Sequence, residues 1–122
     1  MNQLGYSLEV GELQNNIRAI RERGGEVIVA AERSEVVGCV CVLMDARLAE
    51  GVYAEIVSLV VSENCRGTGI GKGLVTEAEK WSGEKVNKIR VRANAIRDNA
   101  HRFYKSLGYD EIKTQKIFRK TV

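Results

Sequence analysis

Glycines recur between Arg66 and Gly73, in a stretch that links an apolar run to an amphipathic segment. Glycine lets the main chain turn freely and lets a ligand approach the backbone closely. The free N–H groups that open a helix attract anions. The chemistry that this stretch could support is therefore phosphate binding. A glycine-rich turn without a ligand is the structural alternative, but such turns are seldom so dense in glycine.

Two common nucleotide-binding patterns do not fit this loop. The triphosphate-binding loop requires a glycine five residues before its Gly-Lys pair and a Ser or Thr after it. Arg66 and Gly73 hold those positions here. The dinucleotide fingerprint requires three glycines at steps of two and three. In the two possible frames its third position is taken by Lys72 or Leu74, so the spacing excludes both patterns.

The pattern that fits is Arg-x-x-Gly-x-Gly, formed by Arg66, Gly69 and Gly71. It resembles the signature loop of the GNAT superfamily of acetyltransferases, which grips the pyrophosphate of acetyl-CoA. A second stretch, RDNAHRFYKSLGY at residues 97–109, resembles the family's other landmark helix. The resemblance runs from about residue 4 to the C-terminus. It implies one GNAT domain over residues 1–122, an α/β (α+β) fold whose mixed, mostly antiparallel central sheet is flanked by helices.

The resemblance implies acetyl-CoA as co-substrate and no metal. In the family, a bulge in the strand before the loop presents main-chain N–H groups to the thioester carbonyl and to pantetheine. By position, this bulge is expected at Leu59 to Val61. Asn94 and Asn99 flank the start of the last helix, where relatives often contact pantetheine amides. The residues expected to bind the cofactor are Leu59, Val60, Val61, Arg66, Gly67, Thr68, Gly69, Ile70, Gly71, Lys72, Gly73, Asn94 and Asn99.

Glu55 and Tyr104 are the candidate catalytic residues. Acetyl transfer from a thioester to an amine needs an unprotonated amine and a proton for the departing thiolate. The Glu-Ile-Val run at Glu55 resembles the strand that carries the catalytic glutamate of histone-type members, so Glu55 would accept the amine proton. A glutamate paired with Arg90 or Arg92 is the alternative, and the sequence leaves both open. Tyr104 matches the family's general-acid tyrosine, with a core tyrosine as its alternative.

The implied function is transfer of the acetyl group of acetyl-CoA to a primary amine of a small molecule or protein, directly within a ternary complex. The alternative is a non-catalytic acyl-CoA-binding or regulatory module with the same fold. Glu50 and Glu55 are the acidic residues near the acceptor side in sequence, and they would suit a cationic amine. The fold and the cofactor loop do not name the acceptor.

The elements that must position these residues follow from the hydrophobic periodicity. Helices are predicted over residues 8–23, 69–82 and 98–107, the last of them ended by Gly108. Strands are predicted over residues 26–32, 35–47, 53–62, 88–94, 109–113 and 115–120. The first two strands are expected to form an antiparallel hairpin, and the third to be central in the sheet.

The composition of the 122 residues is typical of a soluble domain, with 44% hydrophobic residues and no apolar run long enough for a membrane span. No signal-peptide pattern opens the chain, so we expect a cytoplasmic protein. A net charge of +3 does not indicate nucleic acid binding. The basic residues near the C-terminus are expected on a solvated edge strand. They are Lys113, Lys116, Arg119 and Lys120.

The N-terminal part is short by the standard of the family. Relatives usually begin with a strand and a first helix before the region that Leu4 to Tyr6 resembles, and little precedes it here. Either the acceptor pocket is open or a second subunit supplies the wall. An exposed sheet edge would favour the second possibility, so we predict a homodimer.

Overall fold

The structure is a computed structural model of the chain, and it describes residues 9–93 and 98–122. The chain divides into two compact units, Met1–Arg92 and Ala93–Val122. The second unit contains the helix α3 (Asp98–Ser106). The elements of the first unit are α1 (Val10–Glu22), β1 (Glu26–Glu32), β2 (Glu35–Arg47), β3 (Gly51–Val61), the 3-10 turn η2 (Glu63–Cys65), α2 (Ile70–Gly83) and β4 (Ile89–Val91).

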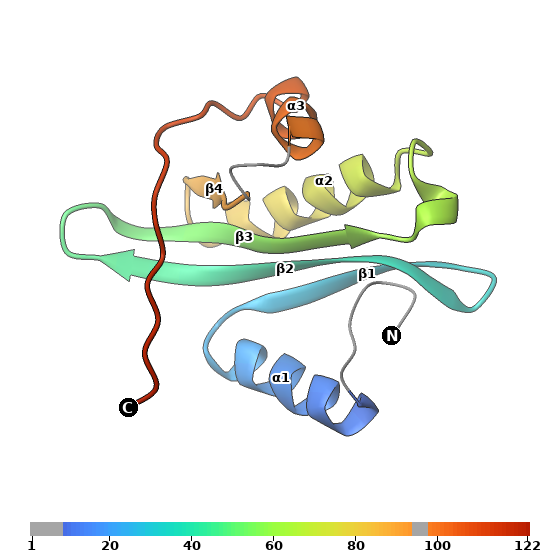
Figure 1. The fold of residues 1–122 in the computed structure, drawn as a ribbon, viewed down its shortest axis with the longest axis horizontal. Helices are drawn as coiled ribbons and strands as arrows, with labels where there is room; N and C mark the ends of the chain where they lie inside the picture. Colours follow the sequence, from blue (N-terminus) through green and yellow to red (C-terminus); the bar gives the residue numbers. More distant parts are fainter. Residues whose placement is uncertain (1–8, 94–97) are drawn as a thin grey trace. The chain divides into compact units, whose positions relative to one another are not determined.

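The first unit is built on a mixed sheet with the strand order β1-β2-β3-β4 (Figure 1). β1 pairs with β2 and β2 with β3 in antiparallel fashion, whereas β3 and β4 are parallel. The hairpin predicted over residues 26–47 is confirmed. Its turn consists of Arg33 and Ser34, whose φ angles of 49° and 69° are the left-handed values of a type I′ turn. The mixed, mostly antiparallel sheet agrees with the predicted fold class.

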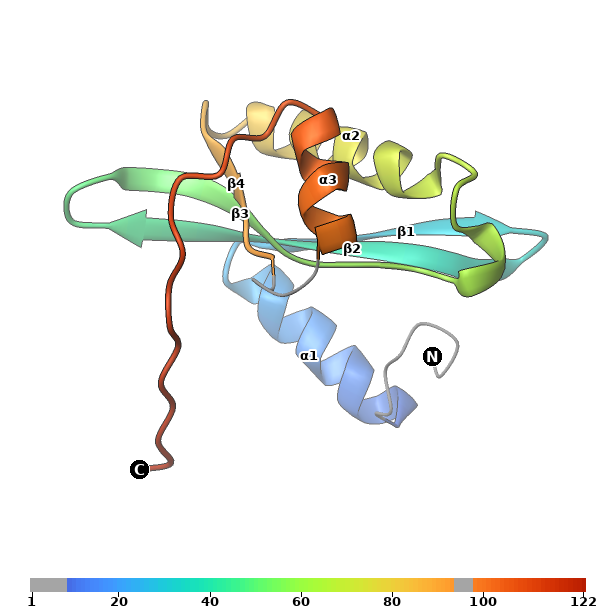
Figure 2. The ribbon, with the colours of Figure 1, turned by 45° about the horizontal axis from the view of Figure 1, so that its top comes forward.

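The helices of the first unit lie on opposite faces of this sheet, α1 on one and α2 on the other (Figures 1 and 2). α2 buries a stripe formed by Leu74, Val75 and Ala78, as the periodicity of the segment predicts. The main part of the core lies between this stripe and the central strands. Its buried sheet residues are Val37, Val40, Val42, Ala54 and Ile56.

Gly38 allows α2 to lie close to the sheet. A Cβ at this position would stand 3.0 Å from Cδ1 of Leu74, 3.1 Å from the Val60 carbonyl oxygen and 3.3 Å from Cγ2 of Ile70. Ile70 is the first residue of α2. The missing side chain therefore sets how near the beginning of this helix comes to the strands.

The second unit differs from the prediction in its last residues. α3 ends where expected, and Gly108 follows it with a φ of 95°. The strands predicted over 109–113 and 115–120 are wrong, because residues 109–122 form no strand and residues 110–122 are exposed. A strand needs a hydrogen-bonded neighbour, and the described part of this unit, residues 93 and 98–122, contains no strand that could supply one. Ile117 and Phe118 are consequently solvent-exposed.

None of the helices in the described ranges has the length and apolar character that crossing a membrane would require.

Candidate active site

The N-terminus of α2 is an uncapped helix end directly after the glycine loop. Gly69 is its N-cap residue, with a φ of 89°, and it has no side chain to bond the first N–H groups. The Gly73 N–H bonds to the Gly69 carbonyl at 3.0 Å. The N–H groups of Ile70, Gly71 and Lys72 precede this bond and have no acceptor inside the helix. They and the positive end of the helix dipole form a site suited to an anion.

The loop before α2 is held by its own backbone. The Cys65 N–H bonds to the Ser62 carbonyl at 2.9 Å, and both the N–H and the hydroxyl of Thr68 donate to the Cys65 carbonyl. The Thr68 hydroxyl thus uses its hydrogen inside the loop, so that it could bind a ligand only as an acceptor. Gly67 has a φ of 80°, which a residue with a side chain adopts only with strain.

Space is open beside three of the loop glycines. A Cβ added at Gly67, Gly69 or Gly73 would meet no atom within 4 Å. These glycines are therefore not explained by packing within the chain. Without side chains, these positions let a ligand come close to the main chain.

Strand β3 contains a bulge that reverses the direction of its peptide groups. Ile56 pairs with Val42 and Ser58 with Cys41, so Val57 is the additional residue. Before the bulge, the Ala54 N–H bonds to Lys88 on the β4 side at 3.0 Å. In a regular strand, the N–H groups of every second residue point to the same side. Without the bulge, the N–H group of residue 62 would therefore point to the β4 side, like that of Ala54.

After the bulge, the Ser62 N–H instead bonds to Val37 at 2.8 Å, on the β2 side. By alternation, the N–H groups of Leu59 and Val61 point to the opposite edge of β3. β4 pairs with β3 only as far as Ile56, and no other described strand of the unit pairs with this edge. The bulge expected at Leu59 to Val61 is thus misplaced, because these residues pair regularly with β2. The outward N–H groups of Leu59 and Val61 follow from a bulge located earlier.

Glu55 is a buried carboxylate on β3, with a side chain only 6% exposed. Its Oε1 atom accepts a hydrogen bond from Nε of Arg92 at 2.9 Å. The Arg92 N–H bonds to the Ile56 carbonyl at 3.0 Å, which fixes this arginine beside β3 just after β4. A charge in the interior requires such a partner. The ion pair predicted as the structural alternative is therefore present, while the role of Glu55 as a base stays a prediction.

A second charged group, the tyrosine cluster, lies beside this pair and contains Asp45, Arg47, Glu50, Tyr53 and Arg90. The buried Tyr53 donates to Oδ2 of Asp45 at 2.8 Å, and Arg90 stacks on the Tyr53 ring at 4.1 Å. Arg90 also bonds to the Tyr53 hydroxyl and lies 3.3 Å from Glu50. Burial and the bond to Asp45 raise the pKa of Tyr53. Hydrogen bonds from Tyr53 and Arg47 lower the pKa of Asp45.

The pairings of Glu50 and Glu55 with arginines remove the acidic character expected near the acceptor. Glu50 is paired with Arg90, and Glu55 with Arg92. Sequence reasoning missed the cluster because its members are distant in the chain, since Arg90 lies 40 positions after Glu50. The signal was the alternation of arginines with apolar residues after residue 88.

Tyr104 belongs to the second unit, on α3. Its ring makes edge contacts with Phe103, at 5.2 Å between centroids, and with Tyr109, at 5.9 Å. Burial raises the pKa of its hydroxyl above the ordinary value of 10.0, so it carries its proton at neutral pH. A protonated hydroxyl is what a general acid requires.

Comparison with known proteins decides the family. The model of the Acetyltransferase (GNAT) family matches residues 4–109. The chain belongs to this family. It is an acetyltransferase relative by descent, and acetyl transfer is the chemistry of its group.

Individual relatives of this GNAT protein agree with the assignment. An uncharacterised N-acetyltransferase of Chlorobaculum tepidum is 36% identical over 121 residues, which cover 94% of the chain and 72% of the relative. An aminoglycoside acetyltransferase from an uncultured soil metagenomic sample, solved with trehalose, has a TM-score of 0.78 at 25% identity, covering 96% and 77% of the two chains. A Trypanosoma brucei acetyltransferase shares the fold, with a TM-score of 0.81 at 22% identity over 98% and 89%.

The cofactor-binding residues predicted for the GNAT protein fall in both units. Those from Leu59 to Gly73 lie together along β3, the loop and the beginning of α2. Arg66 is exposed at the loop. Asn99 is exposed on α3, and Asn94 lies outside the described residues. The GNAT loop is thus continuous with the strand that carries Glu55.

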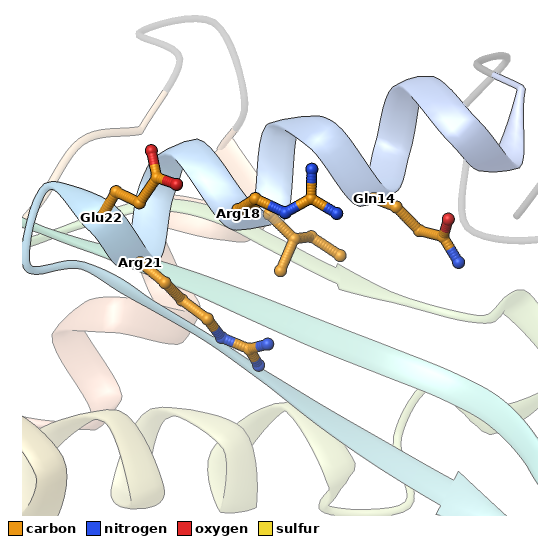
Figure 3. Close-up of a pocket in the computed structure, with 5 residues that line it drawn as sticks. Gln14, Arg18, Arg21 and Glu22 are labelled. Carbon is orange, nitrogen blue, oxygen red and sulfur yellow. The ribbon is translucent and has the colours of Figure 1, made fainter.

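The hollow on the surface of α1 is separate from the site residues of the first unit. It has a volume of about 520 Å³ and is lined by Gln14, Ile17, Arg18, Arg21 and Glu22 (Figure 3). Arg21 is engaged with Glu26 at 2.7 Å. None of the predicted site residues between Glu55 and Gly73 lines this hollow.

In the described ranges of the GNAT protein, no three His, Cys, Asp or Glu side chains come together as metal ligands would. Cys39, Cys41 and Cys65 are not joined in disulfides, and burial raises the pKa of Cys41.

Proposed function

We propose that this GNAT protein transfers the acetyl group of acetyl-CoA to a primary amine, without an acyl-enzyme intermediate. One observation carries the proposal. The strand that bears Glu55 and the outward N–H groups of Leu59 and Val61 leads through the turn η2 and the glycine loop to the uncapped N-terminus of α2. One continuous segment thereby offers a base, donors for a carbonyl and an anion site, which are the three needs of an acyl-CoA donor.

The anion site would hold the pyrophosphate of acetyl-CoA. The N–H groups of Ile70, Gly71 and Lys72 and the charge of Arg66 supply donors, and the open space at Gly67 and Gly73 allows close approach. The thioester would then run along the free edge of β3, where the Leu59 and Val61 N–H groups can bond to its carbonyl and to pantetheine.

In the proposed reaction, the amine nitrogen attacks the thioester carbonyl carbon and the carbon–sulfur bond breaks. The nitrogen gives a proton to Glu55, directly or through water. Tyr104 gives a proton to the leaving sulfur, and its place in this step comes from the family resemblance. The products are the acetylated amine and CoA with a free thiol. No carrier cysteine is needed for this balance.

A cytoplasmic homodimer is the assembly that we propose. The outer edge of β1 has no partner among the described strands, and such edges commonly pair with a second copy. Light scattering at micromolar concentration tests the dimer, and a monomer would contradict it.

The decisive experiment titrates the protein with acetyl-CoA in a thermal-shift assay and then measures thiol release with a panel of primary amines. We expect the melting temperature to rise with the acetyl-CoA concentration, as it does for any ligand that binds only the folded state. The absence of a shift would overturn the proposal. Binding without thiol release for any amine would favour the non-catalytic acyl-CoA-binding module instead.

A further inference from the structure

We infer that Arg92 binds a carboxylate of the acceptor, and that the acceptor is an amine of the amino-acid type, with its carboxylate a few bonds from the amine. The inference rests on the proposed function, because it takes Glu55 as the place where the amine loses its proton. It rests on a difference between two neighbouring arginines, since Arg90 bonds within the chain through both terminal nitrogens and Arg92 only through Nε.

Arg90 is paired within the chain through both terminal nitrogens. One terminal nitrogen bonds to the Tyr53 hydroxyl and the other lies 3.3 Å from Glu50, while the guanidinium stacks on the Tyr53 ring. Its side chain is only 19% exposed. Arg90 is therefore less available to a ligand than Arg92.

Arg92 is only partly engaged. Its Nε atom bonds to Glu55, and its side chain is 48% exposed. Its two terminal nitrogens have no hydrogen-bond or ion-pair partner among the described residues. A guanidinium presents five N–H donors in a planar fork, and the edge formed by the two terminal nitrogens matches a carboxylate with two parallel bonds. Arg92 thus joins a proposed catalytic base to a pair of donors that no residue in the described ranges occupies.

The ion pairs on this face leave little for a second cation. Three acidic residues, Asp45, Glu50 and Glu55, are each paired with an arginine. A further cation would find no unpaired carboxylate in this group. The terminal nitrogens of Arg92 still offer hydrogen-bond donors, and these suit an acceptor with a carboxylate near its amine.

The relative positions of Glu55 and Arg92 define the acceptor further. Glu55 lies opposite Arg90 in the parallel ladder, and Arg92 follows two residues later on the same face of the sheet. An amine at Glu55 and a carboxylate on the outer edge of Arg92 would stand on different sides of one guanidinium group, so the acceptor must carry both groups. Amino acids carry both groups, whereas long polyamines have no group for Arg92.

The experiment compares the twenty amino acids with their primary amides as acceptors for the wild-type protein. The amide removes the carboxylate and retains the amine, which is then less basic and more often unprotonated. We expect kcat/KM for the preferred amino acid to exceed that of its amide by about 10- to 100-fold, as for a charged bidentate contact. Aminoethyl phosphate is included because phosphate also accepts two bonds from a guanidinium.

Three variants test whether such a preference for the carboxylate comes from Arg92. We expect Arg92→Gln to abolish the ratio between acid and amide, mainly through KM, and Arg92→Lys to restore part of it. Because loss of Arg92 also unpairs Glu55, the ratio and not the absolute rate is the readout. Arg47→Gln is the matched control, since Arg47 is 52% exposed and bonds through Nε to a carboxylate, Asp45, at 2.9 Å. It should keep the wild-type ratio.

The outcomes separate this inference from the proposed function. A protein that does not bind acetyl-CoA overturns both. A protein that binds acetyl-CoA but prefers amides, prefers aminoethyl phosphate or uses no amino acid overturns only the carboxylate assignment. An equal loss of the ratio in Arg47→Gln and Arg92→Gln also overturns it.

Discussion

Nε of Arg92 lies 2.9 Å from Oε1 of Glu55, although 37 residues separate them in the chain. β3 and β4 become parallel neighbours through the crossover helix α2. The same helix presents its N-terminus at the glycine loop. The ion pair and the anion site therefore depend on one packing event, the docking of α2 on the sheet.

Glu55→Gln tests the proposed base. The amide cannot accept the amine proton, so we expect kcat to fall about 10²- to 10⁴-fold while the affinity for acetyl-CoA stays unchanged. Steady-state thiol release and calorimetric titration measure the two quantities. Glu50→Gln is the control, because Glu50 also pairs with an arginine but is exposed. Similar kcat losses in both variants would show that Glu55 has no special role.

Gly73→Ala tests whether the open space at the loop receives the cofactor. Gly73 lies inside α2, so alanine should raise the free energy of unfolding by about 0.5–1 kcal/mol. At the same time, we expect weaker binding of acetyl-CoA, because the new methyl group would occupy space that the phosphates approach.

The control for this variant is Gly83→Ala, at the other end of the same helix. Its Cβ also meets nothing within 4 Å. Thermal melts with and without acetyl-CoA measure both effects. If Gly73→Ala keeps full acetyl-CoA affinity, Gly73 is not part of the cofactor site.

Gly38→Ala tests the docking of α2. The new Cβ would lie 3.0 Å from Cδ1 of Leu74 and 3.1 Å from the Val60 carbonyl oxygen, so Leu74 and the beginning of the helix are expected to shift outward by a few tenths of an ångström. We expect a loss of about 1–3 kcal/mol in unfolding free energy, as for other overpacked sites. Acetyl-CoA affinity should fall too, because the beginning of α2 moves. Denaturant unfolding checks the first effect, and unchanged stability would mean that the close contact is relieved elsewhere.

Tyr104→Phe tests the proposed acid. Because burial raises the pKa of Tyr104 above 10.0, its hydroxyl keeps the proton at lower pH and loses it only as the pH rises through this higher value. Wild-type kcat should therefore show no loss from this group below about pH 10. The variant should be about 10²-fold slower and lack any alkaline limb from residue 104.

The raised pKa of Tyr104 also predicts how the stability of the fold changes with pH. A raised pKa in the folded state means that the contribution of Tyr104 is fully present below the pKa of the unfolded chain and is lost as the pH rises through the folded value. Above about pH 10 the free energy of unfolding should thus fall for the wild type through this group, whereas Tyr104→Phe should lack that fall. At lower pH the two proteins should respond to pH in the same way. A variant as alkali-sensitive as the wild type would contradict the buried position.

Much of the fold could be predicted because the signals are local. Alternation of apolar residues gave the hairpin of β1 and β2, and the helical stripe gave α2 within one residue at each end. The position of the bulge could not be predicted in this way. Leu59 and Ile56 both face α2, through pairing with Val40 and Val42, although they are three residues apart. Only the partner strand reveals the additional residue.

The site residues likewise divide into those that the local sequence could reveal and those that it could not. The glycine loop could be found because its residues are adjacent in the chain, and Glu55 because its strand resembles that of relatives. The tyrosine cluster could not, since its contacts join β2, β3 and β4. The strands predicted after residue 108 failed because strand formation depends on a neighbour that local sequence does not specify.

The additional residue Val57 also limits how this strand can change length. If the strand lost the bulge but kept Val57, everything from Ser58 to the glycine loop would be turned over relative to Glu55. Leu59 would then lie on the side of Glu55, and its N–H group would face β2. Deleting Val57 together with the bulge would instead keep the present orientation, so a related sequence without the bulge should show a one-residue gap at this point.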